Sequence, residues 1–223
     1  SAPFSLLTYQ DVKQHVEQIV DVTSSRFMPP WLPKQGHGEF AHERRLNDEQ
    51  LEQIRRWVEA GAPEGDLADL PEPPQWAEGW QLGEPDLVVT MPEPYLLQAE
   101  GVDVFRNFVL PVPISKTHYV KAVEFRPGNP RVVHHLTMQV DPTPTSQRLD
   151  EKDAEPGYPG MLYSRNVRVP DGQLLGWTPG KLPHPAGDEM AWRIQPGTDL
   201  VLQLHMLPGG KPEPVQVSVG FFF

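Results

Sequence analysis

Residues 199–206 read DLVLQLHM, and this stretch decides the fold class. Its large apolar residues stand at every second position, as Leu200, Leu202, Leu204 and Met206. Successive side chains of a β-strand point to opposite faces, so this period of two predicts a strand with one face in the core. His205 then projects from the other face, beside Gln203. There it is either a ligand displayed on a rigid strand or an exposed strand histidine.

Similar apolar or alternating runs recur on both sides of this strand. They cover residues 104–111, 119–125, 132–140 and 215–223, and Pro-Gly turns separate them. Short strands at such spacing are typical of an all-β domain. We predict a mainly β fold, with an antiparallel β-sandwich over residues 99–223.

A histidine pair lies inside one of these runs, at His134 and His135. A strict period of two places His134 on one face with Leu136 and Met138, and His135 on the opposite face. Two neighbouring residues can bind one metal ion only if the strand bends, bulges or ends there, and bulges do gather at functional sites. In the alternative interpretation, His134 is a hydrogen-bonded core histidine and His135 is a surface residue.

The first 66 residues have a different pattern, with apolar residues at helical spacing. Thr8 and Asp11 are placed to cap a first helix that runs to Ser24-Ser25, and Asn47 is placed to cap a second helix that ends near Gly61. We predict a small helical segment over residues 1–66.

Residues 67–98 are rich in proline and acidic side chains, with the sequence PEPP at 71–74. Proline keeps the backbone extended and removes hydrogen-bond donors. We predict that this stretch is a linker between two domains.

Composition excludes several functional classes. The 223 residues include 19 Lys and Arg against 30 Asp and Glu, a net charge of −11, which repels nucleic acid. No apolar run approaches the roughly 18 residues of a transmembrane helix. The chain has no cysteine, so within it any transition metal must be held by His, Met or carboxylate side chains.

Beyond these patterns, the β region resembles the first domain of the copper type II, ascorbate-dependent monooxygenases, the family of peptidylglycine α-hydroxylating monooxygenase and dopamine β-monooxygenase. The similar stretches are FVLPVP at 108–113, YVKAVEFRPG at 119–128, VHH at 133–135, GWTPG at 176–180, VLQLH at 201–205 and VSVG at 217–220. They occur in the family's order and span about residues 100–223.

The resemblance implies a jelly-roll-like sandwich in which His134, His135 and His205 bind the family's electron-transfer copper. Imidazoles suit both oxidation states of copper. In the family, a second domain carries the copper that binds oxygen and attacks a substrate C–H bond. The resemblance therefore implies part of a monooxygenase whose second copper domain lies downstream, a small-molecule reductant or redox protein as partner, and a periplasmic or extracellular location.

The N-terminal part looks like the c-type cytochrome segment that precedes such copper domains in bacterial proteins. The similar stretches are SAPFSLL at 1–7, MPPW at 28–31 and residues 46–63. Met28 matches the axial methionine, and the resemblance implies haem c where a C-x-x-C-H attachment motif lies upstream. In the alternative interpretation, Met28 is a core or turn methionine before two prolines.

Two other functions stay open at this stage. The first is a non-catalytic β-sandwich that binds a metal or another ligand and whose histidines are structural. The second is a hydrolytic zinc site, which three histidines can also form.

Overall fold

The computed structural model of the chain describes residues 4–40, 43–72, 79–172, 174–187 and 189–223. The chain divides into two compact units, a helical unit that reaches residue 74 and a β unit that begins at residue 75. Each unit is described by itself.

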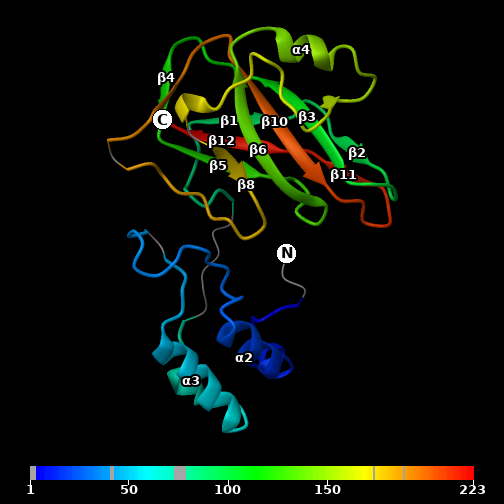
Figure 1. Ribbon diagram of the computed structural model, residues 1–223. Coiled ribbons are helices and arrows are strands. Elements are labelled where there is room, and N and C mark those ends of the chain that lie inside the picture. Colours follow the sequence, from blue (N-terminus) through cyan, green and yellow to red (C-terminus); the bar gives the residue numbers. More distant parts are fainter. Residues whose placement is uncertain (1–3, 41–42, 73–78, 173, 188) are drawn as a thin grey trace. The chain divides into compact units, whose positions relative to one another are not determined.

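The β unit is built from short antiparallel strands (Figure 1), so the prediction of a mainly antiparallel β fold is confirmed. Among the described residues the strands are β1 (Leu87–Thr90), β2 (Tyr95–Leu97), β3 (Val104–Pro111), β4 (His118–Val120), β5 (Ala122–Arg126), β6 (Val133–Asp141), β7 (Tyr158–Pro159), β8 (Leu175–Trp177), β9 (Trp192–Ile194), β10 (Asp199–Met206), β11 (Glu213–Val215) and β12 (Ser218–Phe222). A short helix, α4 (Thr145–Asp150), follows β6, and a 3-10 turn, η2 (Pro170–Gly172), precedes β8.

The largest sheet has the strand order β7-β3-β10-β6-β8, with β10 at its centre. A three-stranded sheet has the order β1-β12-β5, and two further strand pairs are β11-β2 and β4-β9. Buried side chains of both larger sheets belong to one hydrophobic cluster, to which β10 contributes its leucines and β12 contributes Phe221. The sheets therefore share one core, which makes β10 a rigid support for the side chains on its other face.

The helical unit contains α1 (Tyr9–Lys13), α2 (Val16–Ser24), α3 (Asp48–Glu59) and a 3-10 turn, η1 (Leu67–Asp69). Both predicted caps form: Thr8 and Asp11 exchange hydrogen bonds between side chain and backbone N–H, and Asn47 does the same with Gln50. The first helix, however, is interrupted at His15, whose backbone leaves the helical region and whose ring stacks on Phe4 at 3.7 Å. It therefore forms two helices where the pattern predicted one.

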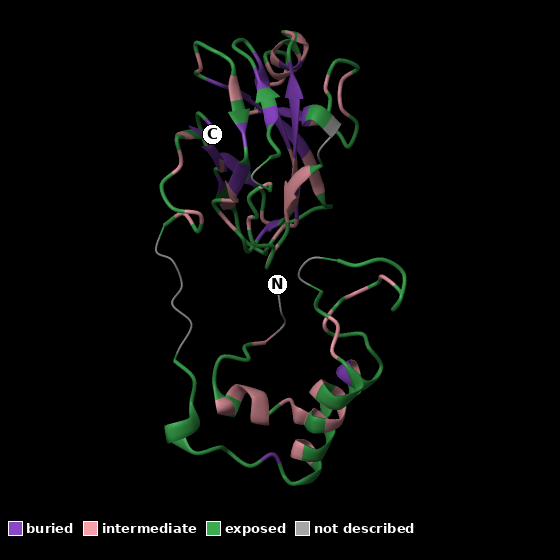
Figure 2. Cartoon of the chain, turned by 90° about the vertical axis from the view of Figure 1, so that its left-hand side faces the viewer, coloured by how far each residue is buried: buried purple, intermediate pink, exposed green. Residues whose placement is uncertain are grey.

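Few residues of the helical unit are buried (Figure 2). Helices α1 and α3 contain no buried residue, and α2 contains only Thr23. Large apolar side chains such as Leu32 and Phe27 are exposed in this unit.

The predicted linker over residues 67–98 differs from the structure at its C-terminal end. Strand β1 pairs with β12 and strand β2 pairs with β11, so residues 87–97 belong to the β unit. The partner strands lie more than 100 residues further along the chain. The proline-rich sequence around residues 87–97 therefore gave no sign that these residues form strands. The centre of the predicted linker, residues 73–78, lies outside the described residues.

Within the part of the chain that the structure describes, no helix is long and apolar enough to cross a membrane.

Candidate metal centre

A β-bulge brings the histidine pair together on β6. In the antiparallel ladder of β6 and β10, His205 is paired with His135, but the next residue of β10, Met206, is paired with Val133. His134 is therefore the extra residue, with no partner of its own on β10. The sequence pattern had indicated that only such an irregularity could place both histidines at one site.

Because of the bulge, the faces of β6 differ from those that strict alternation predicted. A strict alternation placed His134 on the core face and Val133 on the opposite face. The structure has the reverse, because the inserted residue shifts the alternation by one: Val133 is 1% exposed and packs in the core, whereas His134 is exposed. The alternative interpretation of His134 as a core histidine is wrong.

The three histidines form one cluster. The Nδ1 atoms of His134 and His135 are 3.1 Å apart, and the ring centroids of both residues lie 4.9 Å from that of His205. One nitrogen from each ring lies within 4.8 Å of the others. Nitrogens bound to a single ion at about 2.0 Å in tetrahedral geometry are themselves about 3.3 Å apart. Small side-chain rotations can therefore bring all three rings onto one ion.

His205 is the most enclosed member of the cluster, with a side chain that is 11% exposed. Its Nε2 lies 2.9 Å from Oδ2 of Asp103, and the ring of Phe105 stacks on its imidazole at 4.1 Å and 9°. Its Nδ1 is buried and has no hydrogen-bond partner among the described residues. A buried nitrogen without a partner costs about 1–3 kcal/mol, and a metal ion at that nitrogen would remove the cost.

The pKa of His135 favours metal binding. Burial lowers the pKa of His135, and the neighbouring His205 and His134 lower it further. Metal ions bind the neutral form of imidazole, so a lowered pKa reduces competition from protons. With its three imidazoles, the unpartnered Nδ1 and the absence of thiolate, the donor set fits copper, and it also fits zinc.

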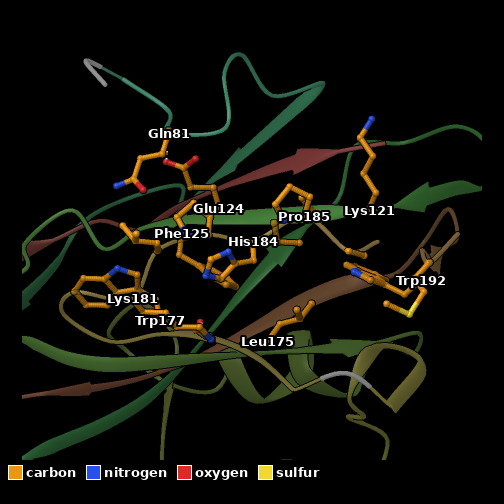
Figure 3. Close-up of a pocket in the computed structure, with 17 residues that line it drawn as sticks. Gln81, Lys121, Glu124, Phe125, Leu175, Trp177, Lys181, His184, Pro185 and Trp192 are labelled. Carbon is orange, nitrogen blue, oxygen red and sulfur yellow. Dashed lines mark hydrogen bonds between the residues drawn. The ribbon is translucent and has the colours of Figure 1, made fainter. Parts of the chain in front are cut away.

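One cavity borders the cluster at His135, and a second cavity shares part of its wall. The smaller, of about 190 Å³, is lined by His135, Leu174, Trp177 and Lys181 among others. The larger, of about 380 Å³, also has Trp177 and Lys181 in its wall (Figure 3). Its remaining lining includes residues of β5, of the segment 181–186 and Trp192. The two cavities thus adjoin at Trp177.

Asp103 and Phe105 were missed by sequence reasoning. Their signal was present, because two residues that are two apart at the start of a strand share a face. Only the pairing of β3 with β10, which sets Phe105 opposite His205, shows that this shared face is that of the cluster.

Met28, the predicted axial ligand of haem, lies in the helical unit, far along the chain from the histidines. Met28 is 44% exposed and lines a pocket of about 310 Å³ together with Trp31 and Arg45. The indole N–H of Trp31 is buried without a partner among the described residues. Met28 offers a thioether to this pocket, but Arg45 is already ion-paired with Glu43, and the described lining residues of the pocket include no histidine or cysteine.

No protein-family model matches the chain, and no curated protein matches it.

Proposed function

We propose that the β unit is the electron-relaying copper domain of a copper monooxygenase that hydroxylates a C–H bond with O2. The observation that carries the proposal is the convergence of His134, His135 and His205 through the bulge in β6. The resemblance of residues 100–223 to the first domain of that family supports it, as does the order in which the similar stretches occur.

When bound, copper supplies a site that stores and releases one electron. The chain's own residues set the conditions for this. His205 is held on the central strand of the largest sheet, whereas His134 is exposed. A small reductant or a redox protein can therefore approach the cluster from the side of His134. The ligands contain no thiolate, so the site would lack the intense colour of blue copper proteins.

The finer features of the proposal follow from the resemblance. The β unit would be a jelly-roll-like sandwich, and the second, oxygen-binding copper would be held by a domain downstream of these residues. The helical unit would be a c-type cytochrome segment that donates electrons, in which Met28 would bind the haem iron. A periplasmic or extracellular location would suit this set of partners.

A second candidate function is a non-catalytic module that binds a small ligand. The observation that favours it is the 380 Å³ cavity in Figure 3, which is large enough for a small organic molecule and has Trp177 and Trp192 in its wall. In that case the histidines would be structural.

The redox role can be tested by following the cupric EPR signal of the copper-loaded chain. We expect excess ascorbate to bleach the signal and air to restore it, because all-imidazole ligation supports both oxidation states. The variant His205→Ala, treated identically, should show the spectrum of weakly bound copper. A cupric signal that persists under excess ascorbate would contradict the relay, and a chain that binds no copper would favour the second candidate.

A further inference from the structure

Oδ2 of Asp103 lies 2.9 Å from Nε2 of His205, and Nδ1 of the same ring is buried without a partner among the described residues. We infer that Asp103 is a positioning residue of the metal centre, which acts through His205 and does not itself bind the ion. The inference rests on the proposed function, since it assigns a role at that same site. Nothing in the sequence pattern assigned a role to Asp103.

Strand pairing places Asp103 beside His205. In the ladder of β3 and β10, Phe105 is opposite His205 and Val104 is opposite Met206. Asp103 immediately precedes β3 and lies two residues from Phe105, so both project to the face that carries His205. Asp103 is thereby a diagonal neighbour of His205, and its Oδ2 lies 2.9 Å from Nε2.

The chemistry of the two groups fixes the tautomer. An ionised carboxylate is a hydrogen-bond acceptor only, so the Nε2 atom of His205 must carry the hydrogen. In a neutral imidazole the other nitrogen, Nδ1, then has a free lone pair. This is the same Nδ1 that is buried without a partner among the described residues. Asp103 therefore leaves the lone pair of His205 available on the enclosed side of the ring.

Phe105 provides a second constraint on the same imidazole. Its ring is nearly parallel to that of His205, at 4.1 Å and 9°, so it restricts rotation of the imidazole. The carboxylate of Asp103 is not among the donor atoms that group together, which comprise the three histidines. Its side chain is 56% exposed, so it contributes little to the core. Its position is explained by the hydrogen bond to His205.

The experiment compares Asp103→Ala with the conservative Asp103→Asn in the full chain. The first measurement is ¹⁵N NMR of the histidine rings in the metal-free protein at pH 8. We expect His205 in the native chain and in Asp103→Asn to be the Nε2–H tautomer, because an amide oxygen can accept the same bond. In Asp103→Ala we expect a mixture of tautomers, while His118 in each variant keeps its native spectrum.

The second measurement is the affinity for Cu(II), determined by competition with a chelator. We expect Asp103→Ala to weaken binding about 10- to 100-fold, the usual effect of removing such a hydrogen-bond partner. Asp103→Asn should weaken it by less than about tenfold, because the bond remains but loses its charge. Unchanged tautomer and unchanged affinity in Asp103→Ala would overturn the inference while leaving the copper site standing. A native chain that binds Cu(II) no better than His205→Ala would instead overturn the proposed function.

Discussion

At the scale of single residues, two buried aspartates oppose each other at the end of the sheet away from the cluster. Asp141 on β6 is paired with Asp199 on β10. Asp141 accepts hydrogen bonds from the backbone and hydroxyl groups of both Thr143 and Ser146. Burial raises the pKa of Asp141, but these bonds outweigh burial and hold it below its usual value. For Asp199, burial and the charge of Asp141 raise the pKa.

We predict that Asp199→Asn stabilises the chain at pH 7. Asp199 is 5% exposed, and its raised pKa means that the ionised form costs stability in the folded state. Removing the charge should raise the free energy of unfolding by about 1 kcal/mol. As pH falls through the folded pKa of Asp199 and below its ordinary value of 3.8, the native carboxyl protonates and the advantage should disappear.

Urea unfolding of both proteins at pH 7 and at pH 3.5 measures this difference. An equal advantage at both pH values, or a loss of stability at pH 7, would show that the charge of Asp199 is not the cause.

At the scale of elements, the bulge in β6 is the feature on which the metal centre depends. Deleting His134 would leave Val133 and His135 adjacent, which restores strict alternation opposite Met206 and His205. We predict that the deletion variant folds with a free energy of unfolding within about 1.5 kcal/mol of the native value, because the core side chains keep their faces. Its copper affinity should fall as far as that of His134→Ala.

Circular dichroism with urea unfolding, together with copper competition, tests this prediction. A deletion variant that fails to fold would contradict the account of the bulge as a local insertion. Native copper affinity would contradict the role of His134 as a ligand.

Some of these elements could be predicted from the sequence, and others could not. The strand at residues 199–206 was predictable because its alternation is regular and the alternating residues of its leucine face are all large and apolar. The caps at Thr8 and Asn47 were predictable because capping depends on residues three apart. The bulge was not, because the sequence around the histidine pair allows two alternations, and only pairing with β10, about 70 residues away, selects one of them.

Strand β1 shows the same limit. Its residues, Leu87–Thr90, follow a proline-rich stretch and are only half-buried or exposed at three of four positions. It is a strand because β12 pairs with it from the other end of the chain. The three histidines could be predicted as candidate ligands from their residue type and their positions in predicted strands. The roles of Asp103 and Phe105 could be seen only once the register of β3 against β10 was known.

At the scale of the whole molecule, the part of the chain that the structure describes holds one cluster of histidines suited to a transition metal. Among the described residues, the only group of three or more histidine or acidic side chains that brings its donor atoms together is the histidine cluster. In the proposed function this group relays an electron, and oxygen is bound at another copper on another domain. We therefore predict that residues 1–223 alone do not hydroxylate a substrate.

Oxygen uptake with ascorbate, copper and a panel of C–H substrates measures this. The rate should match that of free copper at the same concentration and should not depend on substrate. Product formation that requires both substrate and His205 would show that this chain completes the reaction without a second copper domain.

The most direct test of the account is the copper content of the chain after loading and removal of free metal. We predict about one copper per chain for the native protein, since three imidazoles complete one site. Each of His134→Ala, His135→Ala and His205→Ala should fall well below that value, whereas His184→Ala, which removes a histidine of the same unit outside the cluster, should retain it. Undiminished copper in all three cluster variants would contradict the assignment of the site.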